Sequence, residues 1–311
     1  MSRMRRILAM AALSLSMVML AACSDLGQQG ASEQPAGSKL RLTLGTKNFT
    51  ESAVMGELYK QALEQNGYQV IVRKNIGGTE IIDEKLQAGE IDAYPEYIGL
   101  AASAVAGENV LGKSAEETAK LAKDFYATRD QVLSQETPFE NTESVAVTTL
   151  FAQRNGLRKI ADLRDLRTFT FGARPEFEAR QQGFAGLQSV YRLTNGKFVP
   201  VAVDARFVAL FGGDVDAANV FSTDPQLASG DYRVLEDTKR LFGYQHVALV
   251  IGEDKLKSLG RNKFMGVVNS VNKQLTQSTI IQLNAAVDLD KRDAADVAGA
   301  FLQERGLVNA G

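Results

Sequence analysis

The hydrophobic pattern of the chain switches repeatedly between two periods, one typical of strands and one typical of helices. Residues 40–45 alternate apolar and polar side chains, which predicts a half-buried strand. Within residues 51–66, Val54, Leu58 and Ala62 recur at helical spacing and predict an amphipathic helix. Strand-like and helix-like segments then alternate to the end of the chain. We therefore expect an α/β fold with mostly parallel sheets.

The remaining predicted elements follow from the same two patterns. Ser114 and Glu117 form a capping box, which predicts that a helix begins directly after Ser114. We predict further strands over residues 68–76, 91–94, 144–151, 169–173, 198–203, 215–221, 232–235 and 247–251. We predict further helices over residues 79–88, 115–128 and 176–192, and a helical C-terminal part from residue 262 onward.

One short sequence occurs in two related forms. Residues 88–93 (Ala-Gly-Glu-Ile-Asp-Ala) resemble residues 212–217 (Gly-Gly-Asp-Val-Asp-Ala), and each copy leads into a short strand. The first strand runs toward Tyr94 and Tyr97, and the second runs toward Phe221. Ligands of open α/β sheets bind beyond the carboxyl ends of the strands. We therefore expect two similar lobes whose copies face each other across a cleft, with a chance match as the alternative.

The N-terminus has the pattern of a targeting signal. Arginines within the first six residues precede an apolar run over residues 7–22, and Cys23 follows directly. A charged start, an apolar middle and small residues at the end predict a secretory signal peptide over residues 1–22. The run is shorter than the ~20 residues of a membrane helix. The sequence Leu20-Ala21-Ala22-Cys23 resembles a lipobox, so we expect lipidation of Cys23 and cleavage before it. The alternatives are a core cysteine after an ordinary signal, and an uncleaved anchor.

The segment after the cysteine predicts how the protein is held in the cell envelope. Residues 23–38 are mostly small and polar, which predicts a flexible tether that carries the lipid. We therefore expect a membrane-anchored lipoprotein on the periplasmic or extracytoplasmic side. Ser24, and not Asp, follows the cysteine, so inner-membrane and outer-membrane placement both remain open.

Composition excludes several classes of function. The net charge is −2 without a long basic run in the mature part, which argues against nucleic acid as a partner. A single cysteine excludes an intramolecular disulfide, and the lack of a second long apolar run predicts a soluble body. No zinc-ligand spacing, phosphate loop or nucleophile elbow is present, so we expect no metal and no cofactor.

The single histidine bears on catalysis. His246 stands just before an apolar strand, where a lone histidine is more often structural or ligand-contacting than a catalytic base. The sequence therefore favours a binding protein over an enzyme. An envelope enzyme that acts on a small amine remains the alternative from another class, and a sensor or scaffold whose lobes do not close is a third.

Several motifs, in order, carry a family resemblance. Residues 45–52 (Gly-Thr-Lys-Asn-Phe-Thr-Glu-Ser) follow the first strand, and residues 94–99 (Tyr-Pro-Glu-Tyr-Ile-Gly) follow later. Further matching segments are residues 77–79, 171–172, 175–177 with Arg180, 222–224, 235–237, 283–284 and 301–302. From residue 40 to the end, the chain resembles substrate-binding proteins of osmoprotectant ABC importers. Members of that family bind glycine betaine, choline or related quaternary amines.

The resemblance implies an architecture and a set of partners. It implies a two-lobed periplasmic-binding-protein fold of type II that closes on its ligand. Lobe 1 would combine residues 39–141 and 247–311, and lobe 2 would span residues 142–246. The partners would be a small osmolyte, an ABC permease and its ATPase on separate chains, and the membrane through the lipid anchor. We expect a monomer.

The resemblance also implies ligand-binding residues. Lys47 and Arg180 would hold a ligand carboxylate through charge-assisted hydrogen bonds. Tyr97 would form one wall of an aromatic cage around a cation, and Phe221 occupies a position where tyrosine is usual. The alternatives are a solvated loop lysine, an Arg180 paired with Glu176 one helical turn earlier, and two ordinary core aromatics.

Departures from the family pattern predict an altered pocket. Leu100 replaces an expected hydroxyl, Glu143 or its neighbour Ser144 replaces one cage tyrosine, and Gln245 replaces another. Thr223, from the segment Ser222-Thr223-Asp224, completes the predicted ligand-binding set. A pocket with fewer aromatics and more polar groups predicts a small zwitterion or cation as ligand, with weak affinity for glycine betaine. A receptor of the same fold for a different cationic or amino-acid-like ligand is the alternative.

Overall fold

The computed structural model describes residues 40–309, and these belong to one compact unit. The predicted signal peptide, Cys23 and the tether lie outside the described residues. None of the helices within residues 40–309 combines the length and the apolar character that a membrane span needs.

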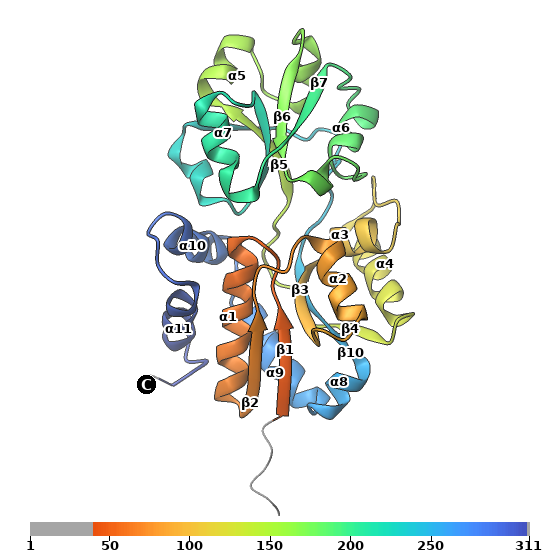
Figure 1. Cartoon of the computed structure of the whole chain (residues 1–311), viewed down its shortest axis with the longest axis vertical. Helices are drawn as coiled ribbons and strands as arrows, with labels where there is room; N and C mark the ends of the chain where they lie inside the picture. The colour runs from red at the N-terminus through yellow and green to blue at the C-terminus, as the bar shows by residue number, and fades with distance from the viewer. Residues whose placement is uncertain (1–39, 310–311) are drawn as a thin grey trace, which may run out of the picture. The chain divides into compact units, whose positions relative to one another are not determined.

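Two five-stranded sheets form the body of the protein (Figure 1). The first sheet has the strand order β2-β1-β3-β10-β4. Its strands are β1 (Leu40–Gly45), β2 (Tyr68–Arg73), β3 (Ala93–Tyr97), β4 (Gln131–Leu133) and β10 (Val247–Gly252). We call this sheet with its helices lobe 1.

Helices cover both faces of the first sheet. One face packs against α1 (Thr50–Gln65), α9 (Arg261–Asn272), α10 (Gln277–Asp288) and α11 (Ala294–Glu304). The other face packs against α2 (Thr79–Gln87), α3 (Ile98–Leu100), a π-helical turn (Ala101–Val105) and α4 (Ala115–Ala127). The short helix α8 (Glu253–Ser258) follows β10.

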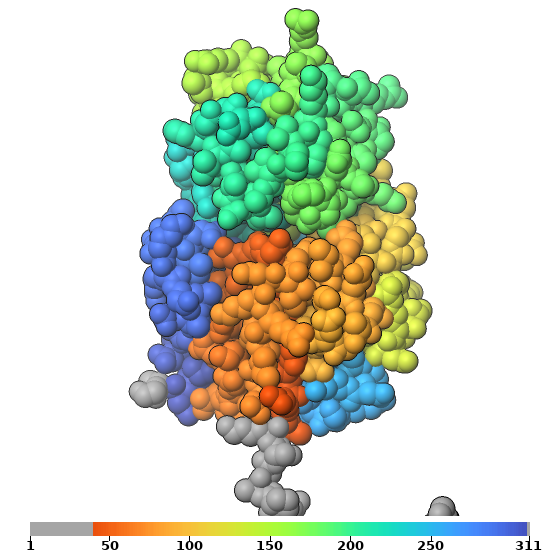
Figure 2. Space-filling model, viewed as in Figure 1, coloured from red at the N-terminus to blue at the C-terminus, as the bar shows by residue number. Residues whose placement is uncertain are grey.

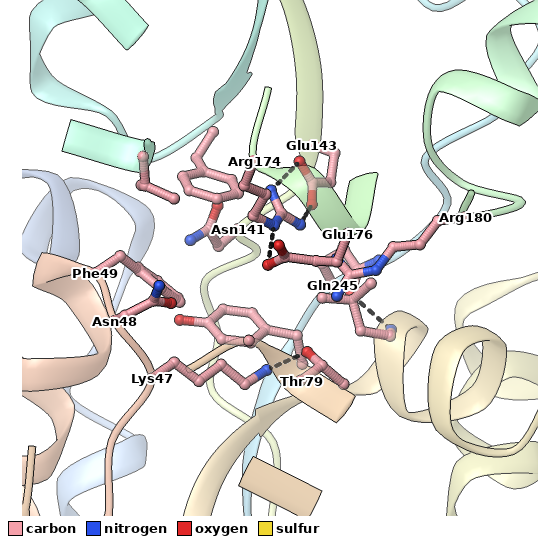
Figure 3. A pocket seen from close by; sticks show the side chains of 15 residues that line it. Lys47, Asn48, Phe49, Thr79, Asn141, Glu143, Arg174, Glu176, Arg180 and Gln245 are labelled. Atoms are coloured by element: carbon pink, nitrogen blue, oxygen red, sulfur yellow. Dashed lines mark hydrogen bonds and ion pairs between the residues drawn. The ribbon is translucent and has the colours of Figure 1, made fainter. Parts of the chain in front are cut away.

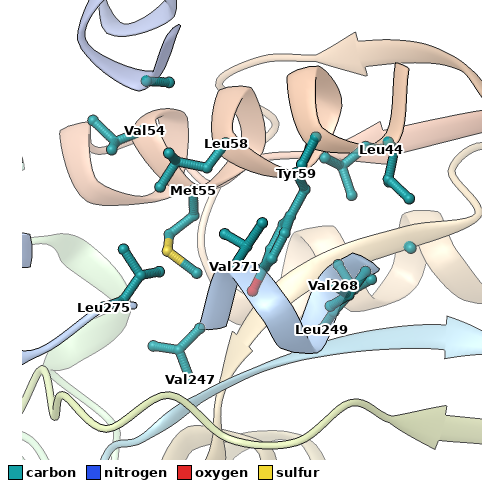
Figure 4. Packing of buried hydrophobic residues seen from close by; sticks show 14 of the residues in the cluster. Leu44, Val54, Met55, Leu58, Tyr59, Val247, Leu249, Val268, Val271 and Leu275 are labelled. Carbon is teal, nitrogen blue, oxygen red and sulfur yellow. The ribbon is translucent and has the colours of Figure 1, made fainter. Parts of the chain in front are cut away.

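The sequence of β10 shows why the first sheet is buried on both sides. Val247 and Leu249 point into the cluster with α1 and α9, whereas Ala248 and Val250 point into the cluster with α2 and α4. Every residue of the strand before its terminal glycine is thus apolar and buried. On the α1 side, Leu58 lies in the same packed layer as Leu249 (Figure 4).

The second sheet has the order β7-β6-β8-β5-β9 and forms lobe 2 with its helices. Its strands are β5 (Glu143–Thr148), β6 (Phe169–Ala173), β7 (Gly196–Pro200), β8 (Ala217–Phe221) and β9 (Tyr232–Leu235). Its α-helices are α5 (Thr149–Asn155), α6 (Phe184–Val190) and α7 (Arg206–Gly212). Short 3₁₀ turns cover Ile160–Asp165, Pro175–Phe177, Val203–Ala205 and Pro225–Ser229.

The two copies of the repeated sequence occupy equivalent places in the two sheets, as predicted, but the ends of the strands that follow them, and not the copies themselves, line the cavity between the lobes. The Asp92 side chain accepts a hydrogen bond from the Thr43 backbone N–H at 2.7 Å, just before β3. The Asp216 side chain accepts one from the Thr170 backbone N–H at 2.8 Å, just before β8. Strands β3 and β8 are both the central strands of their sheets. Each aspartate thus fastens its central strand to the neighbouring parallel strand.

The expectation of mostly parallel sheets is wrong. Strands β1, β2 and β3 pair in parallel, and so do β6, β7 and β8, but β10 runs antiparallel to both β3 and β4. Strand β5 likewise runs antiparallel to β8 and β9. Both exceptions arise where the chain crosses from one lobe to the other, because the strand that follows a crossover enters its new sheet from the opposite end.

Several predicted elements have other boundaries, and several short elements were missed, among them α3, α5 and α8. The strand predicted over residues 144–151 ends at Thr148, whose hydroxyl caps the start of α5. The helix predicted over residues 176–192 is broken, and a side chain on Gly183 would collide with the Phe177 carbonyl at 2.2 Å. Strand β3 covers Ala93–Tyr97 instead of the predicted residues 91–94. Strand β4 and helix α7 are short, and their sequence patterns did not indicate them.

Two crossover segments join the lobes and lie side by side. They connect β4 to β5 and β9 to β10. The Asn141 N–H donates to the Gln245 carbonyl at 3.0 Å, and the Thr137 N–H donates to the Val247 carbonyl at 2.8 Å. These two hydrogen-bonded segments are the covalent connections between the lobes.

Candidate functional site

A narrow cavity lies between the two lobes (Figure 3). Its wall is formed by Lys47, Asn48, Phe49, Gly78, Thr79, Tyr97, Leu100, Asn141, Glu143, Arg174, Glu176, Arg180, Val203, Phe221 and Gln245. The centre of a water molecule can occupy only about 20 Å³ of it, which is room for about one water. Atoms of the two lobes meet on the face shown in Figure 2, so the lobes are closed over this cavity.

Lys47 is a buried residue of the cavity wall and not a solvated loop lysine. It follows β1 and is 2% exposed. Its ammonium donates to the Thr79 hydroxyl at 2.7 Å and forms an ion pair with Glu96. Burial lowers the pKa of Lys47 and raises the pKa of Glu96, while their mutual attraction opposes both shifts. Glu96 therefore balances the buried positive charge of Lys47, which water reaches poorly.

Three aromatic rings form one wall. The Phe49 ring centroid lies 5.8 Å from that of Tyr97 and 5.5 Å from that of Phe221. Cations of the protein already contact two of these rings. The Lys47 ammonium lies 4.7 Å from the Tyr97 centroid, and the Arg206 guanidinium lies 4.4 Å from the Phe221 centroid. The wall joins both lobes, because Tyr97 ends β3 and Phe221 ends β8.

Arg174 was not predicted from the sequence, and its side chain has more hydrogen-bond and ion-pair partners than that of Lys47 or Arg180. It directly follows β6, and its guanidinium holds both Glu143 oxygens and donates to Asn219 Oδ1 at 2.9 Å. Its Nε lies 3.2 Å from Glu176. Although burial alone would raise the pKa of Glu143, Arg174 holds it below the usual range. Its position at the carboxyl end of a strand, beside the Pro-Glu-Phe motif, is the signal that could have found it.

Arg180 joins the two lobes. Its Nε donates to Glu80 Oε1 at 3.0 Å and its Nη2 donates to Glu80 Oε2 at 2.6 Å, in a bidentate ion pair. Glu80 lies in the first turn of α2 in lobe 1, so the predicted alternative partner, Glu176, is wrong. Burial alone would raise the pKa of Glu80, but the hydrogen bonds from Arg180 keep it below its usual value. Among residues 40–309, the buried Nη1 of Arg180 has no hydrogen-bond partner.

The sequence over residues 41–304 matches a protein-family model, OpuAC, described as the substrate-binding domain of an ABC-type glycine betaine transport system. The chain belongs to this family. It is therefore a substrate-binding protein of an ABC-type transport system, as the sequence motifs predicted.

Relatives match this substrate-binding protein over most of its length. It is 28% identical over 311 residues to the glycine betaine-binding protein YehZ of Escherichia coli (strain K12), across 94% of this chain and 96% of the relative. It is also 28% identical over 270 residues to the ergothioneine transport permease/ergothioneine binding protein EgtU of Helicobacter pylori (strain G27), across 86% of this chain. The match spans about half (48%) of that relative's length.

Solved structures match the fold as well. The crystal structure of a glycine betaine/carnitine/choline ABC transporter superposes with a TM-score of 0.68 at 21% identity, over 87% of this chain and 99% of that chain. The predicted two-lobed α/β binding-protein fold is thereby confirmed.

The cavity of this substrate-binding protein brings together all but one of the predicted ligand-binding residues. The residues that meet there are Lys47, Tyr97, Glu143, Arg180, Phe221 and Gln245. The Gln245 side-chain oxygen accepts a hydrogen bond from the Leu100 backbone N–H at 3.2 Å. Thr223 lies outside this cavity wall and is 1% exposed, and it lines a neighbouring cavity together with Phe221. The lining residues that sequence reasoning missed, besides Arg174, are Asn48, Phe49, Gly78, Thr79, Asn141, Glu176 and Val203.

His246 fastens the crossover segments together and lies outside the cavity wall. Its Nδ1 lies 3.0 Å from the Phe139 carbonyl, and its Nε2 lies 3.0 Å from the Glu140 carboxylate. Both partners are acceptors, so both ring nitrogens must carry hydrogen. The Glu140 carboxylate accordingly raises the pKa of His246, with a further contribution from nearby Glu136. A charged imidazolium whose two N–H groups are engaged is poorly suited to act as a base.

The raised pKa makes a pH-dependent contribution to stability. Because the folded pKa of His246 lies above its unfolded value of about 6.5, the contribution is fully present below that pH and is lost as pH rises through the folded pKa. In urea unfolding, we expect wild type to exceed His246→Gln in stability most at pH 6 and least at pH 9. His246 is the single histidine, so no other imidazole contributes. A difference that stays constant across this range would contradict the assignment.

Proposed function

We propose that this protein captures a small zwitterionic or quaternary-amine osmolyte outside the cytoplasm and delivers it to an ABC importer. The observation that carries the proposal is the cavity, where Lys47 and Arg180 lie with the wall of Phe49, Tyr97 and Phe221. A ligand carboxylate suits the cations, and a ligand cation suits the aromatic faces. Glycine betaine, named in the family description and for the E. coli relative, carries both groups.

The carboxylate of the ligand would use donors that the protein leaves available. An ammonium has three N–H donors, and Thr79 and Glu96 accept two from Lys47. Arg180 keeps Nη1 without an acceptor among the described residues. An unpaired buried donor is unfavourable, so an anion that satisfies it gains more than it would from an already satisfied group.

The cationic end of the ligand would lie against the aromatic wall. Within residues 40–309, Phe49 is the ring of this wall that no lysine or arginine covers, because Lys47 lies over Tyr97 and Arg206 over Phe221. A trimethylammonium group would compete with these charges, which supports weak binding of glycine betaine. A cation with N–H donors could also use Glu176 as an acceptor, so an amino-acid-like ligand remains the second candidate.

Ligand entry requires the lobes to separate, because the closed cavity holds only about one water. We propose that the lobes divide at residues 142 and 246, where the chain crosses between the sheets. Opening would break the Arg180–Glu80 pair, and closure on a ligand larger than one water would leave the cavity wider than it is in this structure. This cycle would strengthen each electrostatic contact by excluding water from the cavity.

The partners follow from this role. We propose that a permease and an ATPase on separate chains accept the ligand, and that lipidated Cys23 and the tether hold the protein at the membrane on the extracytoplasmic side. We also propose that the protein acts as a monomeric receptor and not as an enzyme. The described cavity wall contains carboxylates already paired with cations, and the histidine lies elsewhere, so a base with a nucleophile beside it is not assembled there.

A ligand screen tests the proposed chemistry. In thermal-shift and calorimetric titrations, we expect glycine betaine to bind more tightly than choline, because choline offers no carboxylate to Lys47 and Arg180. Arg180→Lys should weaken glycine betaine binding roughly tenfold or more, since a hydrogen bond to a charged group is worth ~1.5–3 kcal/mol.

Arg129→Lys is the matched control. Arg129 donates to Asp83 at 2.8 Å, in an ion pair outside the cavity wall, and its replacement should leave binding unchanged. Equal binding of choline and glycine betaine, together with an unaffected Arg180→Lys variant, would contradict the proposed carboxylate site. Turnover of a bound amine detected by mass spectrometry would revive the enzyme alternative.

The lipid anchor has a separate test. Cys23→Ser should abolish incorporation of labelled palmitate and move the protein from the membrane fraction to the soluble fraction. Ser24→Ala, next to the same site, should keep the label. A Cys23→Ser protein that remains labelled and membrane-bound would exclude the lipobox interpretation.

A further inference from the structure

Glu51 is a buried carboxylate next to the aromatic wall, where it is hydrogen-bonded to Tyr97. It lies in the first turn of α1, two residues after Phe49, and is 2% exposed. Within residues 40–309, no lysine, arginine or histidine forms an ion pair with it. It is also absent from the wall of the narrow cavity that Lys47 and Tyr97 line. The ligand site described above therefore does not account for this charge.

Neutral donors from separate parts of the chain surround Glu51. The Tyr97 hydroxyl and the Asn141 amide each donate to Glu51 Oε1 at 2.8 Å. The Asn284 amide donates to Glu51 Oε2 at 3.1 Å and to the Thr223 carbonyl at 3.3 Å. These partners come from β3 and α10 of lobe 1, from the first crossover segment, and from the segment after β8 in lobe 2.

The charge of Glu51 suits this set of donors. A buried carboxylate without a cation is unfavourable unless hydrogen bonds compensate it, and the N-terminal turn of a helix favours negative charge. Burial raises the pKa of Glu51, and hydrogen bonds from Thr223, Asn141, Tyr97 and Asn284 oppose that shift. A carboxylate accepts at both oxygens, whereas a glutamine of the same shape would turn an N–H₂ group toward one of these donors.

The contact with Tyr97 reaches the ligand site. Tyr97 forms the cavity wall beside Lys47, and its hydroxyl donates to Glu51 at 2.8 Å. Thr223, whose side chain was predicted to touch the ligand, instead lies beside Glu51 and is bonded through Asn284. Glu51 thus holds the Tyr97 ring of lobe 1, and it belongs to a hydrogen-bond network that reaches Thr223 of lobe 2.

We propose that Glu51 is a positioning residue of the ligand site, which holds the Tyr97 ring in place and links it to lobe 2 through Asn284 and Thr223. The proposal rests on the proposed function in that Tyr97 is taken to contact the ligand. Affinity is then controlled by a side chain that does not touch the ligand.

Calorimetry with glycine betaine as the probe tests the effect on binding. Glu51→Gln should weaken binding roughly tenfold. Glu57→Gln is the matched control, because Glu57 is 3% exposed on the same helix but pairs with Lys74 at 2.6 Å and lies outside the cavity wall. The control should retain wild-type affinity whatever stability it loses. Equal affinity of wild type and Glu51→Gln would overturn the proposal.

A double-mutant cycle separates positioning from general damage. Tyr97→Phe removes the hydroxyl that donates to Glu51 and keeps the ring, so it should also weaken binding. If Glu51 acts through Tyr97, the double variant should lose much less affinity than the sum of the single losses. Full additivity would contradict the proposal, and Tyr97→Phe alone still tests it if Glu51→Gln does not fold.

A ligand-independent measurement distinguishes failure of this inference from failure of the proposed function. With 3-fluorotyrosine incorporated, the ¹⁹F signal of Tyr97 is assigned by its loss in Tyr97→Phe. Glu51→Gln should shift and broaden that signal, and Glu57→Gln should leave it in place. If wild type binds no glycine betaine, the proposed ligand is wrong, and an unchanged signal in Glu51→Gln would still overturn the role of Glu51.

Discussion

Charges buried between the lobes must be balanced within the protein, and this requirement governs the arrangement of the site. Lys47 faces Glu96, Arg174 holds Glu143, and Arg180 reaches across to Glu80. A buried ion pair is weak evidence for stability, but breaking one leaves an expensive unpaired charge. The pairs therefore fix the cations in place, and the proposed ligand anion would use the donors that they leave unpaired.

The two lobes supply this site in similar ways. Each has a cation just after a parallel strand, Lys47 after β1 and Arg174 after β6. Each has an aromatic residue at the end of its central strand, Tyr97 in β3 and Phe221 in β8, and each cation lies near the ring of its own lobe. The repeated Gly-acid-aliphatic-Asp-Ala sequence anchors both central strands. The two half-sites meet at Phe49, whose ring contacts both Tyr97 and Phe221.

Sequence patterns predicted the secondary-structure elements better than the partners of individual side chains. The motif around Tyr97 placed that residue in the site because the end of a central strand points to the cleft in this kind of sheet. Glu80 could not be foreseen as the partner of Arg180, because the two are 100 residues apart in sequence and belong to different lobes. The expected local partner assumed a continuous helix, which the chain breaks before Gly183. Strand direction was missed for a related reason, since it depends on the crossovers and not on local periodicity.

A crystal structure of the protein with bound glycine betaine tests the central claim most directly. The account predicts a ligand carboxylate within hydrogen-bond distance of Arg180 Nη1 and Lys47 Nζ, and a trimethylammonium group against Phe49. Electron density for the ligand on an outer surface, with the space between the lobes unchanged and the same ion pairs closed over it, would contradict the account.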